Sequence, residues 1–421
     1  MIRATRTQWI KFAVVLALYL IFLVWLRSWL GLVVVPFIFD AYITKKIPWT
    51  WWRESKNRHV VTVMGWVDAI VFALVAVYFV NLYFFQNYVI PSSSLEKSLL
   101  TGDYLFVSKM SYGPRVPQTP LHMPLAQHTL PFFNCKSYLE HPQWDYKRVK
   151  GLGDVQLNDI VVFNFPAGDT VATGVPNDDI YRLSYGAGKE LAKPVDLASM
   201  TPEQQRVVYD YYYQLGREYL KENPQNFGEI ISRPVDRREN YVKRCVGLPG
   251  QTLEIKDRII YLDGKANKEP DNVQYRYLVK TKRPIPDDLA HELGISKEDM
   301  MMYYTDASVY NMPLTEKAKA GLLARKDIVV SIENTPADDA GGLYPLNMYK
   351  NWTTDNYGPV WIPKKGETVK LTIENLPVYE RPIHVYEGNE LAVKDGKIYI
   401  NGKETDEYTF KMDYYLSLIH I

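Results

Sequence analysis

Residues 90–110 read IPSSSLEKSLLTGDYLFVSKM, and they divide the sequence into two unlike parts. The chain before this stretch is strongly apolar, whereas after residue 86 it consists of short β-like runs separated by Gly, Pro and Asn. The stretch itself holds three consecutive serines, Ser92 to Ser94, and Lys97 follows closely. It therefore raises the question whether a serine here is a nucleophile, and which lysine activates it.

The composition excludes several classes of protein. The 421 residues allow two or three domains, and a net charge of +1 without a basic stripe argues against a nucleic-acid partner. Only two cysteines, Cys135 and Cys245, rule out a disulfide framework and a cysteine-rich zinc site. We expect two separate thiols, with a single disulfide left open. The seven histidines lack ligand spacing, so we expect no metal and no cofactor.

Two apolar segments lie in residues 1–86, which we interpret as a membrane anchor. Residues 66–85, WVDAIVFALVAVYFVNLYFF, have the length that crosses a bilayer as a helix. The other segment starts at Phe12, meets Arg27 and continues to Phe39. Arg27 either snorkels from a tilted helix or marks a boundary. Because no A-x-A-like site follows, an uncleaved anchor is favoured over a signal peptide.

Basic residues predict the orientation of this anchor. Three lie in the N-terminal tail, and the loop between the apolar segments holds five: Lys45, Lys46, Arg53, Lys56 and Arg58. The positive-inside rule places the richer loop in the cytoplasm. Everything after Phe85 is then extracytoplasmic. The abundant aromatic residues, 32 Tyr and 10 Trp, suit a protein at a membrane interface.

One segment of the extracytoplasmic part occurs twice. Gly250–Lys265 reads GQTLEIKDRIIYLDGK and Gly388–Lys403 reads GNELAVKDGKIYINGK, with eight of sixteen positions identical at an offset of 138. The Asp-Gly and Asn-Gly pairs are hairpin signals because such turns need positive φ. We therefore predict two similar β-hairpins. At the same offset Lys243 aligns with Arg381, which we expect to occupy the equivalent place in the second copy.

Two lysines compete as partner of Ser94. Ser94 and Lys97 fit the S-x-x-K pattern of penicillin-binding proteins, but no K-T-G or K-S-G follows, and Glu96 and Asp103 would keep Lys97 charged. The alternative is Lys243 in NYVKRCVGLPG, a run typical of a buried strand, where burial would lower the pKa of the amine. The sequence favours Lys243.

Three motifs in order resemble bacterial type I signal peptidase, a membrane-anchored serine endopeptidase family with a Ser–Lys dyad. Pro91–Asp103 is similar to its P-S-x-S-M-x-P-T-L-x-x-G-D motif, Asn158–Pro166 to G-D-I-V-V-F-x-x-P, and Tyr241–Gly250 to Y-x-K-R-x-x-G-x-P-G. The resemblance implies a signal-peptidase-like β fold behind N-terminal transmembrane helices, with helical or irregular insertions. It implies Ser94 as nucleophile and Lys243 as general base.

The resemblance also implies the surroundings of the reaction. Ser92 would help to hold the oxyanion, and the backbone at Ile90 and Pro91 would pair with an extended substrate. Arg244 is expected to be a structural partner and Ser93 an ordinary loop residue. The substrates would be preprotein signal peptides with Ala-x-Ala-like sites. The protein would be a multi-pass protein of the bacterial inner membrane, in contact with the lipid bilayer, with a periplasmic catalytic domain. The rival interpretation is a non-catalytic, membrane-tethered β-rich interaction protein.

The chain departs from the family pattern in several places. Leu95, Lys97 and Ser98 replace Met, Pro and Thr, and the family's last motif, G-D-N-R-x-x-S-x-D-S-R, does not follow Tyr415. Residues 416–421 resemble sequencing-adapter read-through. We therefore expect an incomplete and inactive chain in which Lys243 is exposed to water.

These observations predict an order of parts after the anchor. The catalytic β core takes residues 87–167 and 237–265 and is interrupted by an insertion at 168–236. Residues 201–222 are expected to form a helix capped by Thr201. A second insertion or subdomain follows at 266–369, of which residues 284–357 resist assignment. The second hairpin copy returns to the core at 370–415, before the tail.

Overall fold

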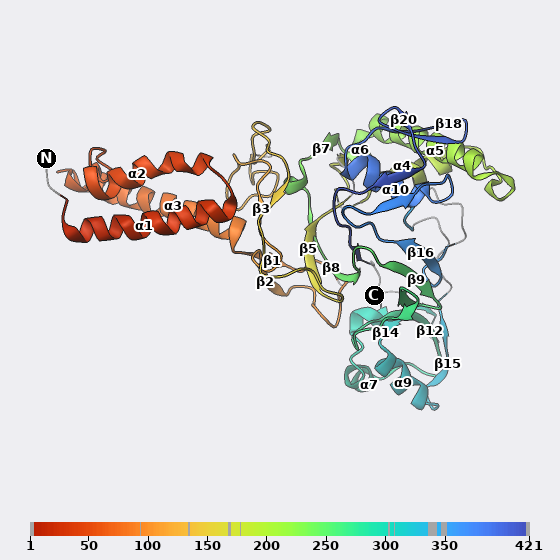
Figure 1. The fold of residues 1–421 in the computed structure, drawn as a ribbon. Helices are drawn as coiled ribbons and strands as arrows, with labels where there is room; N and C mark the ends of the chain where they lie inside the picture. The colour runs from red at the N-terminus through yellow and green to blue at the C-terminus, as the bar shows by residue number, and fades with distance from the viewer. Residues whose placement is uncertain are drawn as a thin grey trace. The chain divides into compact units, whose positions relative to one another are not determined.

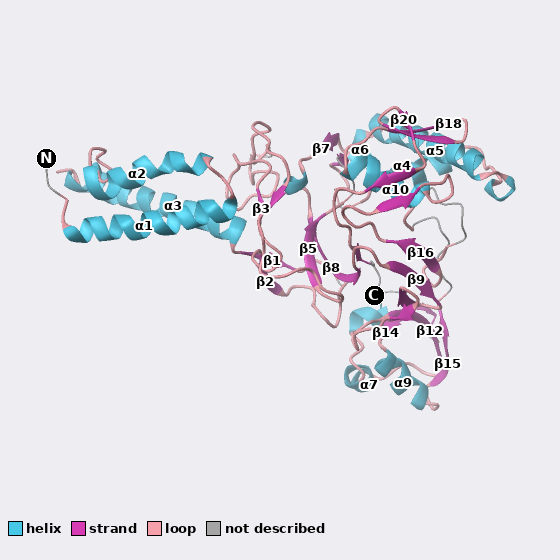
Figure 2. Ribbon diagram, viewed as in Figure 1, coloured by secondary structure: helices cyan, strands magenta, loops and turns pink. Residues whose placement is uncertain are grey.

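The structure is a computed structural model, and it describes residues 4–92, 94–133, 135–166, 170–176, 178–301, 304–306, 308–335, 343–346 and 352–417. The chain forms two compact units. The first comprises residues 1–89 and 104–154, and the second comprises residues 90–103 and 155–421. Two long apolar helices belong to the first unit, and most of the strands belong to the second (Figures 1 and 2).

The helical part of the first unit is built on α1 (Arg6–Leu26) and α3 (Arg58–Tyr83). By length and composition both helices are able to cross a membrane. Helix α1 ends at Leu26 because Arg27 adopts a left-handed conformation with φ of 50°. Arg27 is therefore a boundary and not part of a tilted span. Short helical turns connect the two helices: η1 (Leu30–Val34), α2 (Val35–Phe39), η2 (Asp40–Thr44) and η3 (Trp51–Glu54).

Two short antiparallel pairs complete the first unit. Strand β1 (Phe85–Val89) pairs with β2 (Tyr104–Ser108), and β3 (Arg115–Val116) pairs with β4 (Lys147–Arg148). Phe85 belongs to β1, so the helix that we predicted to end there stops two residues earlier.

Small antiparallel sheets make up most of the second unit. The strand order is β22-β8-β5 in one sheet, β11-β10-β9-β16 in the next and β18-β19-β20 in a third, with β6-β7 and β17-β21 as separate pairs. Their bounds are β5 (Ile160–Asn164), β6 (Thr170–Ala172), β7 (Ile230–Ser232), β8 (Asn240–Gly247), β9 (Thr252–Lys256), β10 (Ile259–Leu262), β11 (Lys265–Ala266), β16 (Tyr357–Trp361), β17 (Thr368–Lys370), β18 (Leu391–Lys394), β19 (Lys397–Ile400), β20 (Lys403–Glu404), β21 (Glu407–Thr409) and β22 (Leu416–Ser417).

The two predicted hairpins are present and have the same register. In the first copy Lys256 faces Ile259 and Leu253 faces Leu262. In the second copy the residues 138 positions later pair in the same way, from Lys394 with Lys397 to Leu391 with Ile400. Strands β11 and β20 extend the two hairpins equivalently. The prediction of a repeated hairpin is confirmed.

The equivalence does not reach upstream to the two aligned basic residues. Lys243 lies on strand β8, whereas Arg381 is the last residue of helix α10 (Leu376–Arg381), which η7 (Pro382–Tyr386) continues. The prediction that Arg381 occupies the place of Lys243 is wrong. Helix α10 buries Leu376 and Tyr379 in a core with the second hairpin, so packing decides its conformation.

The insertion before β8 contains two packed helices, α4 (Ile180–Leu191) and α5 (Pro202–Glu222), followed by α6 (Pro224–Phe227). Thr201 caps α5 in a capping box with Gln204, which confirms the predicted helix. Helix α4 was not predicted. The two helices approach closely at Gly188 and Gly216, where a Cβ atom would lie 1.7 Å from a carbonyl oxygen of the opposite helix.

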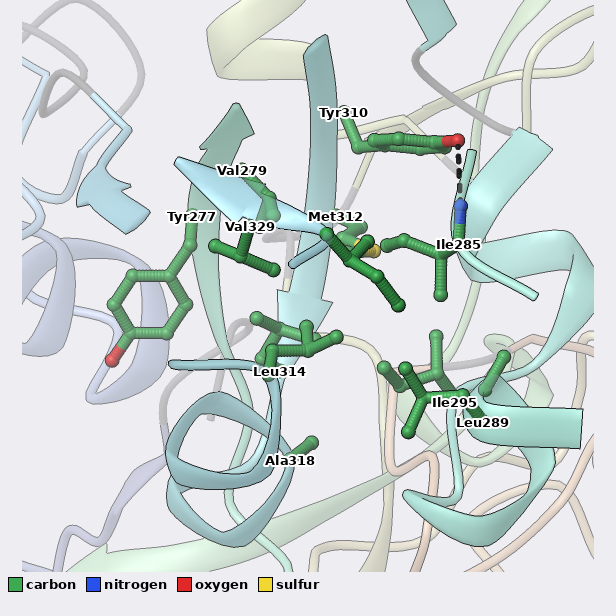
Figure 3. Packing of buried hydrophobic residues seen from close by; sticks show 13 residues of the cluster. Tyr277, Val279, Ile285, Leu289, Ile295, Tyr310, Met312, Leu314, Ala318 and Val329 are labelled. Carbon is green, nitrogen blue, oxygen red and sulfur yellow. Dashed lines mark hydrogen bonds between the residues drawn. The ribbon is translucent and has the colours of Figure 1, made fainter. Parts of the chain in front are cut away.

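The segment that resisted assignment contributes to a compact module. Its sheet has the order β13-β14-β12-β15, with bounds β12 (Tyr275–Thr281), β13 (Tyr304–Asp306), β14 (Val309–Leu314) and β15 (Val329–Asn334). The helices of this module are α7 (Asp287–Glu292), α8 (Lys297–Met301) and α9 (Glu316–Ala324). Figure 3 shows its core, in which Met312 and Leu314 of the sheet lie close to Ile285, Leu289 and Ala318.

Candidate active site

The loop that carries Ser94 is a compact turn of the second unit. The backbone N–H groups of Ser98 and Leu99 both donate to the carbonyl of Leu95, whose side chain is buried. The loop closes where the N–H of Leu100 donates to the carboxylate of Asp103 at 2.8 Å. These local hydrogen bonds fix the main chain on the C-terminal side of Ser94.

Strand β8 brings Lys243 to this loop. The strand pairs antiparallel with β5, and Lys243 lies opposite Val161. Because side chains alternate along a strand, Lys243 shares a face with Cys245, and both are buried. The Nζ atom of Lys243 donates to the Oγ atom of Ser94 at 2.6 Å. The structure thus brings together the two residues that the sequence paired across 149 positions.

Burial shifts the protonation equilibrium of this lysine. Only 7% of Lys243 is exposed, and this desolvation lowers the pKa of its amine from the ordinary value of 10.5. The expectation that Lys243 faces water is therefore wrong, so exposure of this lysine gives no reason to expect an inactive chain. Leu416 and Ser417, which we had placed in the tail, pair with Gly247 and Cys245 along the same strand.

Lys97, the competing partner, is held by carboxylates. Its Nζ atom lies 3.9 Å from Glu96 and 3.5 Å from Asp299, while Asn272 donates to its backbone carbonyl at 3.0 Å. Lys97 is therefore an ion-pair partner of these two carboxylates, whereas Lys243 is the lysine that contacts Ser94. Glu96 was expected as a neighbour, whereas Asp103 hydrogen-bonds Leu100 instead.

The contacts of Asp299 and Asn272 were not predicted. Both residues lie in the chain between the two hairpin copies. The position of this part of the chain depends on the module that contains β12 to β15, whose sequence had no recognisable pattern. The sequence held one signal for these contacts, namely Lys97 in place of the family's proline. A half-buried lysine needs a counter-ion.

Arg244 ties the serine loop to β5. Its guanidinium donates to Ser98 Oγ at 2.9 Å and to the carbonyl of Asn158 at 2.9 Å. Asn158, which stands where the family motif has glycine, adopts φ of 69°, a conformation that asparagine tolerates. The expectation that Arg244 is a structural partner agrees with these contacts.

The residues just before Ser94 differ from one another in exposure and in main-chain pairing. Ser92 and Pro91 are exposed, and Ser93 lies outside the described residues. Ile90 is buried, its N–H donates to the carbonyl of Asp103 at 3.0 Å, and its carbonyl accepts the N–H of Gly102 at 2.9 Å. The main chain of Ile90 is therefore already paired, which argues against the expectation that it pairs with a substrate.

One family model matches the part of the chain that holds these residues. The profile of the family described as "Signal peptidase, peptidase S26" matches residues 63–303, more than half of the chain. The chain belongs to this family. The matched part of the S26 profile includes the serine loop, β5 and β8.

Individual signal peptidases are similar over different lengths. Signal peptidase I P of Bacillus subtilis subsp. natto is 20% identical over 279 residues, which cover 66% of this chain and 90% of that protein. Signal peptidase I of Rickettsia prowazekii is 24% identical over 36% of this chain and 56% of its own length. Signal peptidase I of Helicobacter pylori is 42% identical over 56 residues, or 18% of its length. The chain thus spans less than two thirds of the latter two proteins. No solved structure gives a significant match.

Proposed function

We propose that this S26-family chain is a membrane-bound serine endopeptidase that removes signal peptides from secreted preproteins. The observation that carries the proposal is the 2.6 Å hydrogen bond between a buried lysine, Lys243, and Ser94. A serine hydroxyl is a weak nucleophile until a neighbouring base takes its proton. A lysine can be that base only when it is neutral, and burial favours the neutral form of Lys243.

The proposed reaction proceeds through an acyl-enzyme. Ser94 Oγ attacks the carbonyl carbon of the scissile peptide while the neutral amine of Lys243 accepts the hydroxyl proton. The resulting ammonium returns this proton to the leaving amine as the peptide C–N bond breaks. Lys243 then accepts a proton from water, whose oxygen attacks the ester, and Ser94 regains its hydroxyl.

The negative oxygen of the tetrahedral intermediate requires hydrogen-bond donors. We assign this role to the N–H of Ser94 and the hydroxyl of Ser92. Ser92 is exposed and lies two residues before the nucleophile. Such donors stabilise charge that develops only in the transition state.

Strand β8 offers a docking edge for the substrate. Among the described residues, β22 pairs with β8 only at Cys245 and Gly247, and no strand pairs with Asn240–Arg244 on the side away from β5. An extended peptide added at this edge would form main-chain hydrogen bonds, as in other β-augmentation complexes. It would place its scissile carbonyl beside Lys243. Small pockets would then select small residues at the −1 and −3 positions, as in Ala-x-Ala.

The location follows from the helices and their charges. With α1 and α3 as spans, the five basic residues between them favour a cytoplasmic loop, and the second unit would then lie on the periplasmic side of the bacterial inner membrane. Only ten residues separate Ser94 from the end of α3 at Tyr83. This short connection suits a substrate whose signal peptide lies in the bilayer.

Cleavage assays on three variants test the proposal. Ser94→Ala and Lys243→Met should each lower the cleavage rate of a preprotein with an Ala-x-Ala site by about 10²-fold or more. Lys97→Met is the matched control, because it removes a lysine from the loop of Ser94 and leaves Lys243 on β8 unchanged; it should retain most of the activity. If Lys97→Met were inactive and Lys243→Met active, the assignment of the base would fail.

A serine-directed acylating probe separates this function from that of a non-catalytic interaction protein. The probe should label the unmodified chain at Ser94, and labelling should be lost in Lys243→Met. A chain that binds preproteins without being acylated or cleaving them would contradict the peptidase.

A further inference from the structure

A hairpin of the first unit is rich in apolar residues and takes no part in the proposed catalytic mechanism. Residues 116–135, VPQTPLHMPLAQHTLPFFNC, contain no Asp, Glu, Lys or Arg. We define the apolar hairpin as residues 119–139. Its two limbs are joined by bridges between His122 and Tyr138 and between Thr129 and Lys136, and by main-chain hydrogen bonds such as Met123 N–H to the Ser137 carbonyl at 2.7 Å. These internal bonds satisfy backbone groups without water.

The hairpin exposes large apolar side chains along its whole length. The exposed fractions are 51% for Leu121, 50% for Met123, 76% for Leu125, 100% for Phe132, 78% for Phe133 and 59% for Leu139. Leu125 and Phe132 also adopt positive φ values of 66° and 70°, which bulky residues rarely do. A set of large apolar side chains exposed together in this way is typical of a surface that binds a protein or a membrane.

The base of the hairpin is attached to a candidate membrane span. The hydroxyl of Tyr78, on α3, donates to the carbonyl of Pro120 at 2.9 Å, and the rings of Tyr78 and His122 lie 4.9 Å apart. Tyr78 precedes the last residue of α3, Tyr83, by five positions, which is about 7 Å along a helix. The hairpin base therefore lies level with the last turns of the apolar helix and not beyond its end.

The flanks of the hairpin are attached to the same helix ends. Val149 forms a buried cluster with Leu26 and Tyr83, against which Val116 packs. Figure 1 shows the neighbouring β3 beside the C-terminal ends of α1 and α3. Arg148 and Lys150, next to Val149, are exposed and are suited to lipid phosphates.

We propose that the apolar hairpin inserts into the outer interface of the lipid bilayer, beside α1 and α3. This inference rests on the proposed function, in which these helices span the membrane. Leu125, Phe132 and Phe133 would lie among the upper acyl chains, and the basic flank would meet anionic headgroups. The surface of the hairpin would then continue the lipid-facing surface of α3.

The two cysteines allow a direct test on the whole chain. Cys135 lies near the hairpin tip and is exposed, whereas Cys245 is buried, so an NBD fluorophore can be attached at Cys135. In proteoliposomes, nitroxide-labelled lipids should quench this probe strongly and aqueous iodide weakly. The control is Cys135→Ser with Val330→Cys, an exposed site beside the exposed Lys280–Glu333 ion pair, where iodide should be the stronger quencher.

Two further measurements distinguish the possible failures. Phe132→Ser with Phe133→Ser changes only exposed side chains and should increase iodide quenching at Cys135; unchanged lipid quenching would overturn the proposal. Carbonate washing reports the anchor independently. If the chain stays in the vesicles while iodide reaches Cys135, the hairpin proposal is wrong and the spans stand. If the wash removes the chain, the anchor itself fails and the hairpin proposal fails with it.

Discussion

The two copies of the hairpin, Gly250–Lys265 and Gly388–Lys403, are alike inside and differ in what precedes them. Each has two successive residues of positive φ at its first turn and two more at its second turn. The values are 49° and 73° at Asp257 and Arg258, 50° and 77° at Asp263 and Gly264, 50° and 72° at Asp395 and Gly396, and 51° and 78° at Asn401 and Gly402. Short-range turn chemistry therefore reproduces the same hairpin twice.

The segments before the hairpins have opposite structures and opposite electrostatics. Before the first copy, strand β8 places Lys243 in a buried site against a neutral hydroxyl. Before the second copy, helix α10 places Arg381 3.2 Å from the carboxylate of Asp179 and 4.1 Å from the ring centre of Tyr181. The first arrangement disfavours positive charge and the second favours it. The comparison teaches that the candidate base belongs to β8 and not to the repeated unit.

The pH profile should show the largest difference between the two sites. Because burial lowers the pKa of Lys243, the neutral base becomes more abundant as pH rises toward that pKa. The value of kcat/KM should rise about tenfold per pH unit below it and then level off. Arg381→Lys should show a profile of the same shape. A cleavage rate that is independent of pH throughout the acid range would exclude a lysine base.

The same shift has a consequence for stability. The pKa of Lys243 is lower in the folded chain than in the unfolded chain, so the unfolded chain binds more protons between these two values. The resulting loss of stability is complete below the folded pKa and disappears as pH rises toward 10.5. Lys243→Met should therefore be inactive and yet melt at a higher temperature than the unmodified chain at pH 7.

Arg381→Met should give the opposite combination. The Arg381–Asp179 pair is largely shielded, with 16% and 27% of the side chains exposed, and its loss leaves a carboxylate without its cation. We expect the free energy of unfolding to fall by about 2–4 kcal/mol in urea titrations. The rate at which a serine-directed probe acylates the folded chain should not change. Slower acylation without a loss of stability would connect the second copy to catalysis and would break the comparison.

Local signals explain what could be predicted from the sequence. The hairpins were predicted because Asp263-Gly264 and Asn401-Gly402 encode their own turns. Helix α5 was predicted because Thr201 and Gln204 form a capping box at its start. The proximity of Ser94 and Lys243 was predicted by the resemblance, together with the argument that an effective base must be buried.

Non-local packing explains what could not be predicted. Helix α10 aligns with a strand, and its conformation depends on the burial of Leu376 and Tyr379. The tether from Asp299 to Lys97 depends on the tertiary position of a separate module. The pairing of Ile90 with Gly102 and Asp103 depends on loop closure. None of these contacts follows from the periodicity of one segment.

The smallest expected effect comes from Asp263→Asn, which gives the first copy the turn residue of the second copy. Asp263 Oδ1 accepts the N–H of Thr252 at 2.9 Å, and Asn401 Oδ1 accepts the N–H of Glu390 at 2.9 Å, 138 positions later. Both carboxylate and amide oxygens can accept this bond, and both residue types tolerate the left-handed conformation.

Asp263→Asn should therefore change the free energy of unfolding by no more than about 0.5 kcal/mol in urea titrations. The reverse change, Asn401→Asp, should cost about 1–3 kcal/mol, because Asn401 Nδ2 also donates to Asn389 Oδ1 at 2.9 Å and a carboxylate cannot make this bond. Asp263→Ala and Asn401→Ala are the matched controls. Each removes the acceptor and places alanine at positive φ, so each should cost about 1–2 kcal/mol. A larger loss in Asn401→Ala than in Asp263→Ala would measure the second hydrogen bond of Asn401, to Asn389. If Asp263→Asn cost more than about 1 kcal/mol, the surroundings and not the turn itself would determine the first hairpin. The structural equivalence of the two copies would then not extend to their energetics.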